Sequence, residues 1–82
     1  MLNTLLRLPA VKAECGYSRS TLYLRMSQGL WPRPVSLGAR AVAWPASEVA
    51  MLNAARIAGK TEAEIRALVA KMEAARGAAL AS

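Results

Sequence analysis

The chain has 82 residues, enough for one small domain, and its formal net charge of +6 comes from 11 basic residues against five acidic ones. The basic residues are concentrated at the front: residues 1–40 contain six of them and one acidic residue, whereas residues 41–82 are nearly balanced. A charge bias confined to one region indicates an electrostatic surface for a polyanion. A single cysteine and no histidine exclude an internal disulfide and an ordinary zinc cluster, so no metal site and no cofactor is expected.

The apolar N-terminal residues are not expected to interact with a membrane. The run is too short to cross a bilayer, and Arg7 interrupts it. It also lacks the basic region that precedes the apolar run of a signal peptide. A single cysteine fits a protein of the reducing cytoplasm.

Two short helices are predicted near the front of the chain. The first covers residues 9–15, because proline suits a first helical turn and Gly16 can end the helix. The second covers residues 18–28, capped by the hydroxyl of Ser18 and ended by Gly29. A very short glycine-containing connection between two such helices is the signature of a helix-turn-helix.

A two-stranded β-hairpin is predicted after the second helix. Prolines on both sides of Arg33 forbid a helix and favour an extended path. Large and small side chains alternate in residues 35–37 and 42–44, and a turn at 38–40 separates them. The next helix is predicted over residues 45–58, starting at a proline.

Four side chains around the hairpin and the third helix are expected in the core. Val49 and Leu52 share one face of that helix. The chain has no phenylalanine, so we expect Trp31 and Trp44 to supply the large core side chains.

Residues 1–59 are expected to form one domain that contains the helix-turn-helix and the hairpin, and residues 60–82 a C-terminal amphipathic helix. Thr61 and Glu64 form a capping box at its start. Two surface ion pairs are expected on this helix: Glu62 with Arg66, and Glu73 with Arg76. An apolar stripe at helical spacing either mediates homodimerisation or packs back onto the small core, and it comprises Ile65, Leu68, Val69 and Met72.

No motif in the sequence supports catalysis. Gly59-Lys60-Thr61 is similar to the end of a phosphate-binding loop, but Ala54 occupies the position of its first glycine. A nucleophile elbow around Ser18 would need glycine where Ser20 stands. With no histidine and no aspartate, a Ser-His-Asp triad is impossible, and we do not expect an enzyme.

The start of the 18–28 helix contains side chains of the kinds that contact DNA in other proteins. A short helix can enter the major groove, about 12 Å wide, and contact base edges with its N-terminal residues. Arginine can contact guanine through two hydrogen bonds, and free N–H groups at a helix start favour phosphate. The 33–42 hairpin is placed to contact flanking DNA, as the wing of a winged helix-turn-helix. The predicted DNA contacts are Ser18, Arg19, Ser20, Thr21, Tyr23, Arg25, Arg33 and Arg40. For Tyr23, packing against the core is the alternative.

Residues 7–49, "RLPAVKAECGYSRSTLYLRMSQGLWPRPVSLGARAVAWPASEV", resemble the AlpA family of phage and prophage regulators. The shared pattern is Arg-Leu-Pro, Gly-x-Ser-Arg-Ser-Thr, a tyrosine, Gly-x-aromatic-Pro-x-Pro, Leu-Gly-x-Arg-x-Val-x-Trp and Ser-Glu-Val. The resemblance implies a mostly α-helical winged helix-turn-helix of the excisionase-like and MerR-like group. It also implies a DNA-binding regulator of phage or mobile-element genes, located at the bacterial nucleoid.

Three positions depart from the pattern of the family. Leu24 stands where a basic residue is frequent, Leu30 where lysine is frequent, and Leu52 where tryptophan is frequent. Leu24 is instead placed to meet a thymine methyl group or a partner chain.

Two other functions remain open at the level of sequence. An excisionase-type factor that bends DNA for recombination would use the same fold and charges. A protein–protein adaptor would use the 65–72 stripe and would not touch DNA.

Overall fold

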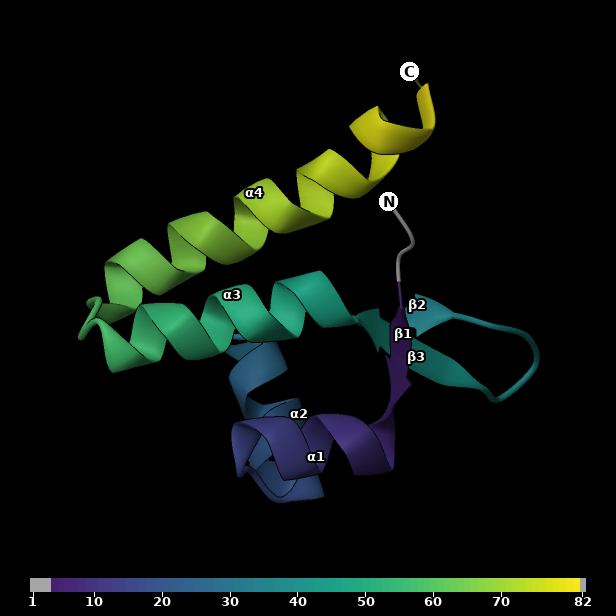
Figure 1. Cartoon of the computed structure of the whole chain (residues 1–82), viewed down its shortest axis with the longest axis horizontal. Helices are drawn as coiled ribbons and strands as arrows, with labels where there is room; N and C mark the ends of the chain where they lie inside the picture. The colour runs from purple at the N-terminus through teal and green to yellow at the C-terminus, as the bar shows by residue number, and fades with distance from the viewer. Residues whose placement is uncertain (1–3, 82) are drawn as a thin grey trace.

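The computed structural model describes the backbone of residues 4–81 and the side chains of residues 4–77. The fold is mostly helical with a small antiparallel sheet, as predicted. Helix α3 lies in the middle, with α4 along one side of it and α1 and α2 on the other (Figure 1). The elements in chain order are β1 (Leu5–Arg7), α1 (Leu8–Cys15), α2 (Arg19–Ser27), β2 (Val35–Ser36), β3 (Val42–Pro45), α3 (Ala46–Ile57) and α4 (Glu62–Ala81).

Helices α1 and α2 form the predicted helix-turn-helix, and local signals set their ends. Gly16 adopts the left-handed conformation (φ 74°) that ends α1, and its N–H donates to the carbonyl of Lys12 at 2.9 Å. Ser18 caps α2 by accepting a hydrogen bond from the backbone N–H of Thr21 at 3.2 Å. Gly29, at φ 77°, turns the chain away after α2.

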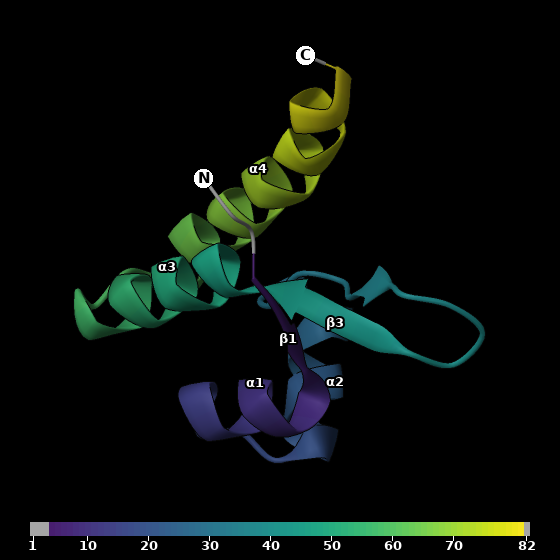
Figure 2. The same cartoon turned by 45° about the vertical axis from the view of Figure 1, so that its right-hand side comes forward.

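The sheet has three strands in the order β1-β3-β2, one more than the two-stranded hairpin that the sequence predicts. Strand β1 pairs antiparallel with β3, so that Leu6 faces Trp44. The prediction missed β1 because three residues are too few to display a period of two. Pro45 closes β3 and precedes the first residue of α3, rather than starting that helix. The loop between β2 and β3 extends away from the helices (Figure 2).

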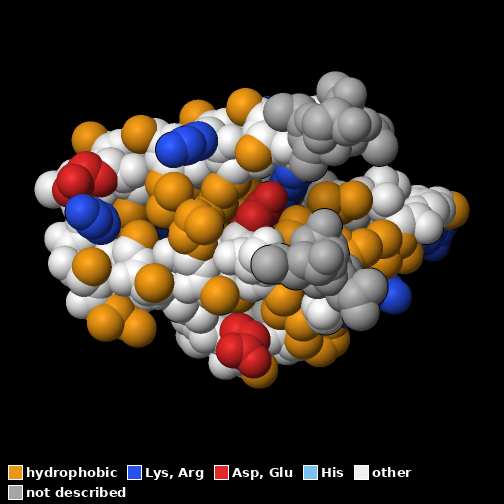
Figure 3. Space-filling view, turned by 45° about the horizontal axis from the view of Figure 1, so that its top comes forward, with side chains coloured by type: hydrophobic (Ala, Val, Ile, Leu, Met, Phe, Trp, Pro, Cys, Tyr) orange, Lys and Arg blue, Asp and Glu red, His pale blue; other side chains and the backbone are white. Residues whose placement is uncertain are grey.

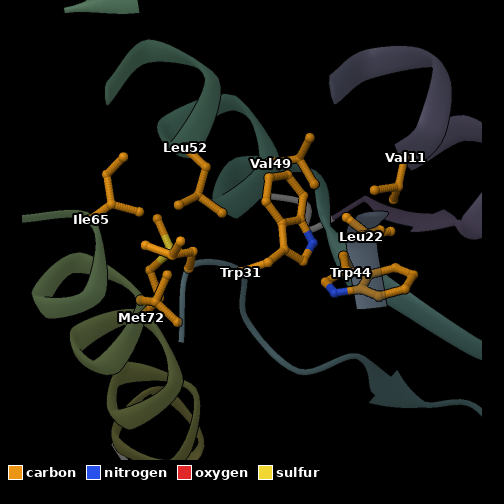
Figure 4. Packing of buried hydrophobic residues seen from close by; sticks show 10 residues of the cluster. Val11, Leu22, Trp31, Trp44, Val49, Leu52, Ile65 and Met72 are labelled. Atoms are coloured by element: carbon orange, nitrogen blue, oxygen red, sulfur yellow. The ribbon is translucent and has the colours of Figure 1, made fainter. Parts of the chain in front are cut away.

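Two tryptophans form the centre of the core, as expected. Trp31 and Trp44 are 1% and 0% exposed, and the Trp44 indole N–H donates to the carbonyl of Pro32 at 2.9 Å. Figure 4 shows Trp31 between two groups of side chains: Leu52, Ile65 and Met72 on one side, and Val11, Leu22 and Trp44 on the other. This packing fixes the orientation of the helix-turn-helix relative to the sheet.

The departures at positions 30 and 52 belong to this core. Leu30 is 5% exposed and Leu52 is 1% exposed. Burying a leucine is favourable by about 1.5–3 kcal/mol, whereas an unpaired lysine would be costly at such a position. Leu30 therefore does not lie on a surface available to DNA.

Helix α4 packs back onto the core of the same chain. Ile65, Val69 and Met72 are all buried there, and Leu68 packs against them. The capping box forms as predicted: the N–H of Thr61 donates to the Glu64 carboxylate at 3.0 Å, and the N–H of Glu64 donates to the Thr61 hydroxyl at 3.2 Å. Hydrogen bonding of the Glu64 carboxylate to the backbone N–H of Thr61, and then to the Thr61 side chain, lowers the pKa of Glu64.

One of the two predicted surface pairs on α4 forms and the other does not. Arg66 lies 3.8 Å from Glu62, as predicted. The predicted pair of Glu73 with Arg76 is wrong, because both side chains have partners far away in the sequence. Glu73 accepts the backbone N–H of Arg33 at 2.7 Å. Arg76 instead reaches α3 and binds both carboxylate oxygens of Glu48, at 2.6 and 3.0 Å.

The Glu48–Arg76 pair lies within an apolar surface. Apolar side chains gather around charged ones on the side of the molecule seen in Figure 3. The pair lines a hollow of about 370 Å³ together with Leu5, Pro45, Ser47, Met51, Met72 and Ala75. Residues of four elements therefore line this hollow: β1, β3, α3 and α4.

Candidate nucleic-acid interface

The first turn of α2 is a surface of hydroxyl groups beside one arginine. Ser18, Arg19 and Ser20 are exposed. The Ser18 hydroxyl donates to the hydroxyl of half-buried Thr21 at 2.9 Å and lies 3.3 Å from that of Ser20. The cap thus holds three hydroxyl groups together at the positive end of the helix.

Tyr23 extends this surface one turn further along α2. Its side chain is 41% exposed, so the core packing considered as its alternative is not what the structure has. The guanidinium carbon of Arg19 lies 5.5 Å from the centre of the Tyr23 ring, within cation–π range. The ring therefore restricts Arg19 and holds its charge at the start of the helix.

Three arginines from distant parts of the chain meet beside this helix. Arg7 of β1, Arg19 of α2 and Arg40 of the β2–β3 loop line one depression of about 210 Å³. Tyr23 lines it too, together with Leu8, Pro9 and Val42. The depression joins the start of α2 to the wing, residues 33–42, in one positively charged surface. We call it the depression below the wing.

Arg7 is the residue that sequence reasoning missed. It adds to the charge of the front half, but no pattern in the sequence assigns it a contact. Its place follows from β1, because Arg7 pairs with Ala43 of the central strand and so stands next to the wing. The only sequence signal is its position in the Arg-Leu-Pro motif.

Leu24 is an apolar side chain in the middle of the exposed face of α2. It is 54% exposed, and its carbonyl accepts the Ser27 hydroxyl at 2.6 Å. Ser20 precedes it by four residues, one helical turn away on the same side. An exposed leucine among hydroxyl groups gives this surface an apolar contact point.

Two of the predicted contacts, Arg25 and Arg33, do not line the depression below the wing. Arg25 is half-buried, donates to the side-chain carbonyl of Gln28 at 3.4 Å, and has its guanidinium 5.8 Å from the ring of Tyr17. Arg33 is exposed, and its backbone is bound to Glu73 of α4. The structure therefore brings Arg19, Tyr23 and Arg40 together and places Arg25 and Arg33 elsewhere.

The described part of the chain shows neither a metal-ligand cluster nor a helix that could span a membrane. Among the side chains of residues 4–77, no group of three or more histidine, cysteine, aspartate or glutamate residues is placed to hold a metal ion. None of the helices there combines the length and apolar character needed to cross a bilayer.

Residues 4–57 match a family model described as "Prophage CP4-57 regulatory protein (AlpA)". The matched range contains the three strands and α1 to α3, and it ends where α3 ends. The chain is also similar to "Uncharacterized protein ORF88" of Enterobacteria phage P4. The two are 51% identical over 55 residues, which make up 67% of this chain and 62% of that protein. The chain thus spans less than two thirds of the length of that relative. No solved structure matches it.

Proposed function

Because the chain belongs to the AlpA family of prophage regulatory proteins, we propose that it binds double-stranded DNA sequence-specifically and regulates transcription of phage or mobile-element genes. The observation that supports this most is the meeting of Arg7, Arg19 and Arg40 beside the start of α2. No carboxylate lines that surface. An uninterrupted positive surface suits the phosphate backbone of DNA. The protein would act at the bacterial nucleoid.

In this proposal α2 enters the major groove and the β2–β3 loop contacts the flanking backbone. Arg19 reads a guanine through its two N–H donors. The Ser20 hydroxyl and the free N–H groups of the first turn contact phosphate, and Ser18, whose hydroxyl hydrogen is bound to Thr21, holds that turn in place. Arg7 and Arg40 contact phosphates beside the groove, and Tyr23 positions Arg19 or donates its hydroxyl to phosphate. Thr21 supports the cap.

The DNA-binding unit of this proposal is residues 1–59, with α4 as a support. A homodimer through Ile65, Leu68, Val69 and Met72 is not part of it, because three of these side chains are buried in the core. An adaptor function through the same stripe lacks support for the same reason. Arg33 remains a contact of the flank in this proposal.

Salt dependence tests whether DNA binding takes place. We expect the affinity for a random duplex to fall as salt rises, with a log–log slope of about −2.7 when Arg7, Arg33 and Arg40 each neutralise one phosphate, at about −0.9 each. Fluorescence anisotropy at several chloride concentrations measures this slope. Weak binding with a flat slope would contradict the proposal.

Leu24 is expected to add base specificity by contacting a thymine methyl group. Replacing that thymine by deoxyuridine removes only the methyl, and we expect about a fourfold loss of affinity, or about 0.8 kcal/mol. Leu24→Ala should lose affinity for the thymine site to a similar degree and no longer distinguish the two duplexes. Ile57→Ala is the control, because Ile57 is 87% exposed at the end of α3, outside the proposed surface. Equal discrimination by Leu24→Ala and the wild type would exclude this contact.

A further inference from the structure

A second group of basic side chains lies apart from the depression below the wing. It lines a pocket of about 180 Å³ where the end of α2, the end of α3 and the start of α4 meet. None of its residues lines the depression that holds Arg7, Arg19 and Arg40. The lining residues are Arg25, Leu30, Arg56, Lys60, Glu62 and Ile65.

The guanidinium groups of two arginines of this pocket lie close to the same aromatic ring. The guanidinium carbons of Arg25 and Arg56 lie 5.8 and 4.9 Å from the centre of the Tyr17 ring. Each gains a cation–π interaction, but two like charges on one ring repel each other. An anion between them would remove that repulsion.

The nearby carboxylates do not neutralise these two arginines. Glu62 lies 3.8 Å from Arg66, and Glu64 lies 3.8 Å from Lys60. Neither Arg25 nor Arg56 makes an ion pair within residues 4–77. Their charges are therefore available to a ligand.

Arg25 and Tyr17 each contain a buried polar atom that lacks a protein partner. They are the Arg25 Nε and the Tyr17 hydroxyl oxygen, which are both fully enclosed. Burying a donor without a partner is costly, and such groups in native proteins usually meet an ion, a ligand or water. Because Nε is shielded, a ligand in the pocket would bind Arg25 through the terminal nitrogens of its guanidinium group.

We propose that this pocket binds a phosphate group, held between Arg25 and Arg56 with Lys60 at its edge. Guanidinium groups match the oxygen geometry of phosphate and bind it through paired hydrogen bonds. The volume equals that of about six liquid water molecules, at about 30 Å³ each, which accommodates five heavy atoms. The phosphate comes either from the DNA backbone, which rests on the proposed function, or from a free phosphorylated molecule, which does not.

The test uses Arg56→Gln in the full chain, because Arg56 is exposed and outside both the core and the depression below the wing. Lys71→Gln is the matched control: it removes one positive charge from an exposed position of α4. Arg56→Lys is the second variant, which keeps the positive charge but removes the paired N–H donors of the guanidinium group. Thermal unfolding in chloride without phosphate first establishes that each variant folds.

Two measurements distinguish the sources of the phosphate. Inorganic phosphate is titrated at constant ionic strength while the melting temperature and the arginine side-chain N–H resonances are followed. The salt slope of binding to a random duplex is measured in parallel. If the ligand is a free phosphorylated molecule, phosphate raises the melting temperature of the wild type and of Lys71→Gln but not of Arg56→Gln. The salt slope of DNA binding is then the same for both variants as for the wild type. For a DNA phosphate, Arg56→Gln reduces the slope by about 0.9 and Lys71→Gln leaves it unchanged.

The inference is overturned if Arg56→Gln matches Lys71→Gln in both measurements. It is also overturned if Arg56→Lys binds phosphate as well as the wild type, because a point charge then suffices. A wild type with a flat salt slope would contradict the proposed function, yet the phosphate titration would still decide on this pocket.

Discussion

Arg19→Ala is expected to lower the affinity for the preferred DNA site by about 10- to 100-fold, or about 1.4–2.8 kcal/mol. Arg19 is the one arginine on the first turn of α2, and the Tyr23 ring restricts its guanidinium. A guanidinium held in this way loses less conformational freedom when it binds guanine. Its removal takes away a base contact and one positive charge together.

Comparing two duplexes distinguishes the loss of the base contact from the loss of the positive charge. Anisotropy titrations against the selected site and a random duplex should show a large loss for the first and a small loss for the second, since only the first contains the guanine contact. Lys71→Ala controls for charge, because Lys71 is exposed on α4 and should change neither affinity appreciably. Equal losses on both duplexes would make Arg19 a phosphate contact, and no loss on either would place the recognition surface elsewhere.

The ends of the helices were predictable because their signals are local. Gly16 and Ser18 act within one turn of the helix they end or cap, through hydrogen bonds to neighbouring backbone. Thr61 and Glu64 do the same for α4. A capping pattern needs no knowledge of the rest of the fold, so the sequence alone predicts it.

The composition of the site was only partly predictable, because α2 presents different residues to different neighbours. With 3.6 residues per turn, Tyr23 lies about 40° around the helix from Arg19, whereas Arg25 lies about 120° from Arg19 in the opposite direction. The same geometry places Arg25 on the side that packs towards Tyr17. The spacing of Arg19 and Arg25 along a helix is therefore enough to assign them to different faces.

Contacts between segments that are distant in the chain could not be predicted from the sequence. Arg7 reaches the wing only because β1 pairs with β3, and nothing in three residues specifies that partner. Glu73 and Arg76 are correctly spaced for a helical pair, but each finds a better partner elsewhere. An exposed pair three residues apart is worth about 0.2–0.5 kcal/mol, so a two-point contact with a buried carboxylate prevails.

Arg76→Ala is expected to lower the free energy of unfolding by about 2–3 kcal/mol. Breaking a fully buried ion pair by removing one partner costs about 3–5 kcal/mol, because a buried charge remains unpaired. The Arg76 and Glu48 side chains are 24% and 11% exposed, so water screens the remaining charge in part and the expected loss is smaller. Urea unfolding followed by tryptophan fluorescence measures it, since Trp31 and Trp44 are both buried.

Two further variants distinguish the effect of the unpaired charge on stability from the effect of lost side-chain packing. Lys71→Ala, on the exposed side of the same helix, should stay within about 0.5 kcal/mol of the wild type. The double variant Glu48→Gln with Arg76→Met removes both charges and should recover most of the stability, because no unpaired charge remains buried. If the double variant is as unstable as Arg76→Ala, lost packing of the long arginine side chain explains the effect instead.

The consequence for DNA binding follows from where the pair lies. Glu48 and Arg76 join α3 to α4, and neither lines the depression that holds Arg7, Arg19 and Arg40. Well below its melting temperature, Arg76→Ala should therefore bind the selected duplex with the affinity of the wild type. A weakened affinity in a variant that is still folded would mean that α4 also controls the position of α2, through the Arg66 side chain that donates to the carbonyl of Gln28 at 2.8 Å.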